Sequence, residues 1–212
     1  MKTTEEQLDQ INQEFISIIR TFFSKGILTK KMLQDYKEAK ATLHGLMESA
    51  FIIAGWRMGF YPVVEPRVPL DSPLLPKDYS PQLKEKRRRK QFRPDVGYHR
   101  AEMPDIFVEC CTTDEAKEYE PSKTHVTKRD ALLHFVKHAK VSAIIICVVL
   151  PRDMVRRPPW KWAKELSNDL FTEFKSGWNQ LANDLQQHVL TRLIILNENG
   201  VYSNKMWHAY LE

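Results

Sequence analysis

The stretch PDVGYHRAEMPDIFVECC, from Pro94 to Cys111, decides the fold. Asp95 stands ahead of a short apolar run, and Glu109 lies inside a stronger one. The residues from His99 to Pro104, between the two runs, favour a turn. Two apolar runs joined by a turn predict a β-hairpin.

Alternation along the second strand of this hairpin sorts its side chains onto two faces. Glu109 and Cys111 should emerge on one face, and Val108 and Cys110 should point to the other. Asp95 and Glu109 can then converge at one edge of a twisted sheet. Carboxylate oxygens with retained water are the ligands that Mg²⁺ requires, so the hairpin predicts a site for a divalent cation.

Helical and strand patterns alternate around the hairpin. Apolar residues recur at three- and four-residue steps in the helical segments and form continuous runs in the strands. The expected elements are helices at 4–24 and 30–58, a strand at 60–64, a proline-rich loop at 65–83, the hairpin, a helix at 124–139, a strand at 141–150, a helix at 160–187, a strand at 189–196, and a last strand or short helix ending at 212. This order predicts an α/β protein with a mixed central β-sheet flanked by helices.

Local sequence signals indicate the central strand of the sheet, the ends of two helices and a second hairpin turn. The segment from Val141 to Leu150 is continuously apolar and β-branched, which is typical of a central strand buried on both faces. Thr3 or Thr4 should cap the first helix, and Gly59 should end the second. The residues from Asn197 to Gly200 predict a second hairpin turn.

The composition is that of an ordinary globular protein. The chain has 212 residues, 42% of them hydrophobic, and a formal net charge of +5. This length suits a single domain, 1–212, with an N-terminal helix at 1–28, a core at 29–150 and a C-terminal extension at 151–212. No apolar run approaches the roughly 20 residues of a membrane span, and the acidic, polar start is unlike a signal peptide, so a soluble, cytoplasmic protein is expected.

The three cysteines are odd in number, and two are adjacent, which fits neither a disulfide framework nor a zinc site. The plain interpretation is buried thiols on strands. A disulfide joining Cys147 to Cys110 or Cys111 stays an alternative if the source is a hyperthermophile.

Basic residues gather in two segments. The first precedes Asp95 directly, so it is either a solvated charged segment or a cationic arm that contacts phosphates first. Its members are Lys84, Lys86, Arg87, Arg88, Arg89, Lys90 and Arg93. The second combines Arg152, Arg156, Arg157 and Lys161 with Trp160 and Trp162. The two tryptophans are equally consistent with anchoring a helix.

The pattern Pro94-Asp95 followed by Glu109-Cys110-Cys111 resembles the signature of the restriction-endonuclease-like, or PD-(D/E)xK, nuclease superfamily. That signature is Pro-Asp and then, on the next strand, an acidic residue, any residue and a lysine. The order of elements from Thr42 to Leu150 also fits this family.

A second motif narrows the resemblance. The residues from Glu48 to Phe60, followed by Val63 and Val64, are similar to the first-helix motif of archaeal Holliday-junction resolvases. In length and character the whole chain resembles nuclease-like proteins of archaeal spindle-shaped viruses (fuselloviruses), which would place it in the host cell cytoplasm.

The resemblance implies a metal site. Glu48, Asp95 and Glu109 would bind Mg²⁺ or Mn²⁺, with the backbone carbonyl of Cys110 as a further ligand. The family's lysine position holds Cys111, whose thiol is largely neutral at pH 7 and cannot replace a cation. Some members carry the lysine on the following helix, where Lys128 is the preferred substitute; Lys123 and Arg129 lie near it in the sequence.

Each acid also has an ordinary interpretation. Glu48 could face solvent or pair with Arg57, and Asp95 could simply form a turn. Asp105, also preceded by proline, competes with Asp95. Glu109 is harder to explain, because a carboxylate in an apolar strand is costly to bury without a metal or a cation.

Two functions follow from these observations. The first is metal-dependent hydrolysis of DNA phosphodiester bonds, with branched junctions as a candidate substrate and a homodimer that matches the junction's two-fold symmetry. The second is DNA binding by a nuclease fold that has lost its chemistry with the family lysine. A purely structural viral protein is a third possibility, but it leaves Glu109 unexplained.

Overall fold

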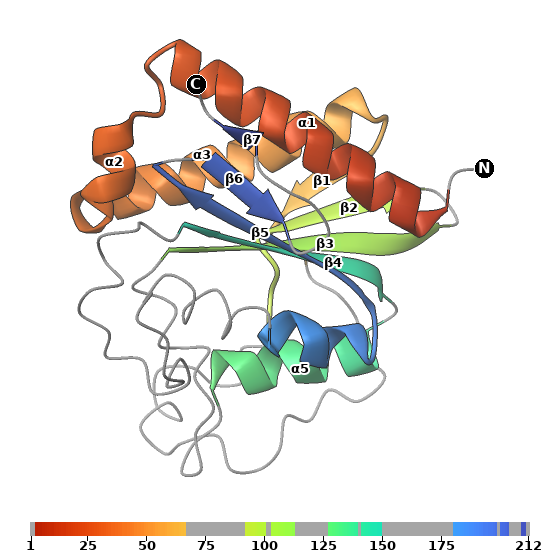
Figure 1. The fold of residues 1–212 in the computed structure, drawn as a ribbon. Coiled ribbons are helices and arrows are strands. Elements are labelled where there is room, and N and C mark those ends of the chain that lie inside the picture. The colour runs from red at the N-terminus through yellow and green to blue at the C-terminus, as the bar shows by residue number, and fades with distance from the viewer. Residues whose placement is uncertain are drawn as a thin grey trace.

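The computed structural model describes residues 3–66, 92–100, 103–112, 127–139, 141–149, 180–198, 200–203 and 209–210. Within these ranges, helices lie on both faces of one sheet (Figure 1). The helices are α1 (Thr4–Ser24), α2 (Lys30–Gln34), α3 (Tyr36–Arg57) and α5 (Lys128–His138). The strands are β1 (Tyr61–Val64), β2 (Val96–Arg100), β3 (Met103–Thr112), β4 (Val141–Val149), β5 (Leu190–Asn197), β6 (Gly200–Ser203) and β7 (Ala209–Tyr210).

The sheet is mixed, as the sequence predicts. Its seven described strands lie in sequence order from β1 to β7. β3, β4 and β5 are parallel, whereas β1 and β2 on one side and β6 and β7 on the other run antiparallel to their neighbours. The α/β fold class is therefore confirmed.

The predicted hairpin is present as β2 and β3. Its strands pair from Val96 opposite Val108 to Arg100 opposite Met103. The predicted turn from His99 to Pro104 is therefore too long, because pairing continues into it after a register shift between Tyr98 and Arg100.

Two apolar cores lie on opposite faces of the sheet. One, beneath α1 and α3, contains Val108 and Cys110, while the other, beneath α5, contains Phe107 and Cys111. The predicted alternation along β3 is confirmed. β4 contributes alternate residues to both cores, so it is the doubly buried central strand that its sequence predicts.

The helices preceding the hairpin follow the prediction in part. Thr3 caps α1 in a capping box with Glu6. The single helix expected at 30–58 is wrong, because Asp35, at φ −92° and ψ 39°, interrupts it between α2 and α3. Gly59 has a φ of +77°, which suits glycine directly after the end of α3.

The later elements also match the prediction in part. The helix expected from residue 124 begins at Lys128, because Thr127 is extended and caps it in a capping box with Asp130. Of the helix expected at 160–187, the structure describes a helical segment at 180–186. The hairpin turn predicted before Gly200 joins β5 to β6.

All three cysteines are free and buried, so neither disulfide alternative is present. Burial raises the pKa of the Cys110 thiol, and burial likewise raises the pKa of the Cys147 thiol. None of the described helices is both long enough and apolar enough to cross a bilayer.

Candidate metal centre

The position of α3 against β2 depends on one buried tyrosine. The Tyr98 hydroxyl donates a hydrogen bond to the backbone carbonyl of Phe51, 2.7 Å away. Its ring lies so close to α3 that a Cβ at Gly55 would be 2.6 Å from the Tyr98 Cε1 atom. A hydrogen bond and a close approach therefore hold the helix in one register on the strand.

This register sets which residues of α3 face the start of β2. Three residues of strand, from Tyr98 back to Asp95, span about 10 Å. Seven residues of helix, from Phe51 back to His44, also span about 10 Å. The middle turns of α3, which carry His44 and Glu48, therefore lie beside Asp95.

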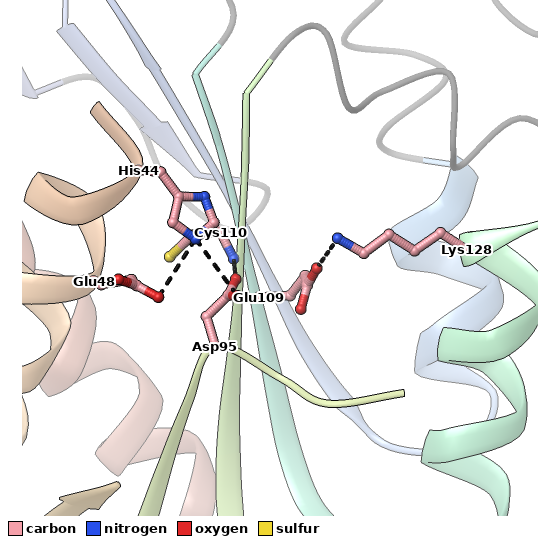
Figure 2. Close-up of polar contacts among 6 residues, drawn as sticks. All are labelled: His44, Glu48, Asp95, Glu109, Cys110 and Lys128. Carbon is pink, nitrogen blue, oxygen red and sulfur yellow. Dashed lines mark hydrogen bonds and ion pairs between the residues drawn. The ribbon is translucent and has the colours of Figure 1, made fainter. Parts of the chain in front are cut away.

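Two side chains of α3 meet Asp95 there, as Figure 2 shows. The His44 Nε2 atom lies 3.4 Å from Glu48 Oε1 and 3.5 Å from Asp95 Oδ1. Potential ligand atoms of the three residues all lie within 4.8 Å of one another. An imidazole and two carboxylates from separate parts of the chain thus form a group that can hold a metal ion.

The backbone fixes Asp95. Its Oδ2 atom accepts a hydrogen bond from the Cys110 N–H at 2.6 Å, and its carbonyl accepts one from the Glu65 N–H at 2.8 Å. A hydrogen bond to one carboxylate oxygen orients the other, as in many metal sites. Asp95 therefore presents Oδ1 toward His44.

Glu109 lies on the other face of β3. Its side chain is 1% exposed, and its Oε1 atom is 2.5 Å from the Nζ atom of Lys128, at the start of α5 (Figure 2). Burial alone would lower the pKa of Lys128, but the carboxylate of Glu109, with Cys111 and Asp95 nearby, raises this pKa above its usual value. Lys128 is therefore held as a cation beside Glu109.

The carboxyl group of Glu48 has an altered acidity. Its pKa is raised, mainly because burial disfavours the charged form and also because Asp95 lies nearby, although His44 opposes this shift. A metal ion would compensate for the proximity of the two carboxylates.

The predicted site residues therefore fall into two groups. Glu48 and Asp95 come together with His44, whereas Glu109 pairs with Lys128. The alternative in which Glu48 pairs with Arg57 is not what the structure shows, because Arg57 pairs with Glu14 at 3.0 Å and Glu48 lies beside His44. The role suggested for the Cys110 carbonyl stays a prediction.

His44 is the residue that sequence reasoning missed. It stands four residues before Glu48, a spacing that places both side chains on one helix face. That spacing is the signal that could have found it.

Most of the predicted DNA-binding residues fall outside the described residues, as does Lys123. This applies to Lys84, Lys86, Arg87, Arg88, Arg89, Lys90, Arg152, Arg156 and Arg157. Arg93 is described and is exposed, two residues before Asp95.

Comparison of the chain with protein-family models, with curated proteins and with solved structures gives no match.

Proposed function

We propose that this protein is a metal-dependent DNA endonuclease. The observation that carries the proposal is the convergence of Glu48, Asp95 and His44 on one side of β3, with the Glu109–Lys128 pair on the other. Carboxylates and a partly exposed lysine around one strand provide metal ligands and a positive charge for a phosphate.

The donor set fits a divalent cation. Glu48 and Asp95 offer oxygen atoms suited to Mg²⁺ or Mn²⁺, and their side chains remain 23% and 16% exposed. A metal bound there would supply Lewis acidity, which activates a water molecule and offsets charge on the scissile phosphate.

Lys128 would take the role of the family lysine. It lies close enough to Cys111, the residue at the family's lysine position, for that residue to contribute to the raised pKa of Lys128. A lysine in the first turn of a helix is disfavoured by the helix dipole, and its pairing with Glu109 offsets that cost. Its ammonium group would hold the phosphate and stabilise the charge that develops on it.

Positive charge near the site favours DNA as the substrate. Arg93 is exposed beside Asp95, and the basic segment from Lys84 to Arg93 precedes the site in sequence. Such residues attract a polyanion and make its binding sensitive to salt. We propose that the substrate is a branched DNA junction and that a homodimer cuts it.

Cleavage of a synthetic four-way junction with Mg²⁺ or Mn²⁺ tests this function. The wild type should cut, and Asp95→Asn should not. Lys128→Met should lose about 10²–10³-fold in rate with DNA affinity nearly intact, because it removes a charge that acts on the transition state. Lys137→Met, which changes an exposed lysine of the same helix, is the matched control.

Two results would contradict the proposal. The first is a wild type that binds the junction but never cuts it, while replacing Cys111 with lysine creates activity; DNA binding alone would then be the function. The second is cleavage that is fully retained in Asp95→Asn.

The basic segment has its own test. Neutralising Arg87, Arg88 and Arg89 together should flatten the dependence of DNA affinity on salt, because each lost phosphate contact removes one counterion-release contribution. An unchanged slope would place the DNA-binding surface elsewhere.

A further inference from the structure

His44 is placed where its imidazole can serve as a metal ligand beside two carboxylates. Its Nε2 atom lies nearly equidistant from two carboxylate oxygens, 3.4 Å from Glu48 Oε1 and 3.5 Å from Asp95 Oδ1. Neighbouring ligand atoms that are each about 2.1 Å from one metal ion are about 3.0 Å apart in octahedral geometry and about 3.4 Å apart in tetrahedral geometry, so small side-chain shifts would let the group close around an ion.

We propose that His44 is a nitrogen ligand of the metal centre, and that it makes the site prefer a first-row transition-metal dication, such as Mn²⁺ or Co²⁺, over Mg²⁺. This inference rests on the metal site of the proposed function and names the ligand that determines its metal. It adds a residue to the carboxylate set predicted from the sequence.

The surroundings of the three residues fit this role. Asp95 has one oxygen bound to the Cys110 N–H, so the other oxygen is directed at His44. The side chain of His44 is 27% exposed, and those of Glu48 and Asp95 are less so. An ion can therefore reach the site from solvent and lose part of its water shell to the protein ligands.

The chemistry of the donors sets the metal preference. Mg²⁺ takes oxygen ligands almost exclusively and gives up its water reluctantly. Imidazole nitrogen favours transition metals, whose affinity rises from Mn²⁺ through Co²⁺ for a given ligand set. One imidazole with two carboxylates should therefore bind Co²⁺ and Mn²⁺ more tightly than Mg²⁺.

Glu109 helps to explain why a histidine is needed. Its Oε1 atom is 2.5 Å from the Lys128 ammonium group, on the opposite face of β3 from His44. A carboxylate held by a lysine is a poorer metal ligand than a carboxylate that faces the ion. His44 supplies the third donor from α3 instead.

Calorimetric titration of the full chain with Mn²⁺, Co²⁺ and Mg²⁺, without DNA, tests the assignment. In His44→Gln the affinity for Mn²⁺ and Co²⁺ should fall at least about tenfold. The affinity for Mg²⁺ should change less than about threefold, because its oxygen ligands remain. His188→Gln, at an exposed histidine before β5, should bind all three metals like the wild type.

A spectroscopic signature distinguishes ligation from a structural effect. With ¹⁵N-labelled histidine, electron spin echo modulation of bound Mn²⁺ should reveal coupling to nitrogen in the wild type and in His188→Gln, but not in His44→Gln. Nitrogen coupling that persists in His44→Gln would overturn the proposal, and so would unchanged Mn²⁺ affinity or a wild type that binds no metal.

The two proposals can fail separately. If the wild type cuts DNA with Mg²⁺ and His44→Gln binds every metal normally, the nuclease function stands and the His44 assignment fails. If His44 ligates Mn²⁺ but no DNA is cut under any condition, the metal centre stands and the nuclease function fails.

Discussion

Removing the positive charge of Lys128 should destabilise the fold through Glu109. In Lys128→Met the stem of the side chain is kept and the ammonium group is lost, which leaves an ionised carboxylate that is 1% exposed. Breaking a fully buried ion pair in this way costs about 3–5 kcal/mol. Lys128 retains 28% exposure, which lets solvent screen the pair, so we expect a loss of about 2–3 kcal/mol.

The reverse change should cost less. In Glu109→Gln the remaining charge belongs to Lys128, whose longer and partly exposed side chain can extend toward solvent. We expect a loss of about 1 kcal/mol for this variant. The double variant should be more stable than Lys128→Met alone, because it contains no buried unpaired charge.

Urea unfolding in the presence of EDTA measures these differences without a contribution from bound metal. Lys137→Met, at an exposed position of α5, should stay within about 0.5 kcal/mol of the wild type. A double variant that is no more stable than Lys128→Met would refute the reasoning, because the cost would then not come from the unpaired carboxylate.

Three further predictions concern the packing that positions the site. Gly55→Ala should destabilise the protein by about 1–2 kcal/mol in urea unfolding, because the new Cβ would lie 2.6 Å from the Tyr98 ring. In Gly45→Ala, on the same helix, the new Cβ meets nothing within 4 Å, so this variant should be stabilised by about 0.5–1 kcal/mol. Equal changes in stability for the two variants would contradict this prediction. Tyr98→Phe should lose about 1–2 kcal/mol with its hydrogen bond to Phe51, and an unchanged unfolding midpoint would argue against that bond. The three buried cysteines should not react with Ellman's reagent at pH 8 until the protein is unfolded, and fast reaction of any thiol in the native protein would contradict their burial.

Strand positions were predictable because their signals are local. The apolar run of β4 and the two runs of β2 and β3 carry their own periodicity, and each forms a strand in the sheet. The faces of β3 were predictable for the same reason, since alternation is a property of the strand alone.

The helix boundaries that were missed depend on single polar residues. Asp35 interrupts the expected helix although apolar spacing continues through it, so periodicity alone could not reveal the break. The start of α5 was readable in principle, because Thr127 and Asp130 have the spacing of a capping box. Apolar periodicity gives the extent of a helix less precisely than its caps do.

The grouping of the site residues could not be read from the sequence, because it depends on how α3 sits on β2. Glu48 and Asp95 are far apart in the chain, and nothing local fixes the helix register that brings His44 between them. Tyr98 fixes it, through its hydrogen bond to Phe51 and the absence of a side chain at Gly55. A shift of one residue along the helix would turn His44 about 100° away from Asp95.

Lys128 can reach Glu109 because the alternation of side chains along β3 points Glu109 toward α5 and away from His44. Positions 109 and 111 of β3 share the face covered by α5, so a lysine from strand position 111 or from the start of α5 can reach the same carboxylate. Cys111 is buried in the apolar core on that face, and Lys128 brings its charge from the solvent-accessible end of the helix. Because the Lys128 side chain stays partly exposed, holding its cation beside Glu109 costs less than burying a lysine completely would cost. A lysine on α5 thus provides a positive charge beside Glu109 while position 111 of the strand packs as an apolar residue.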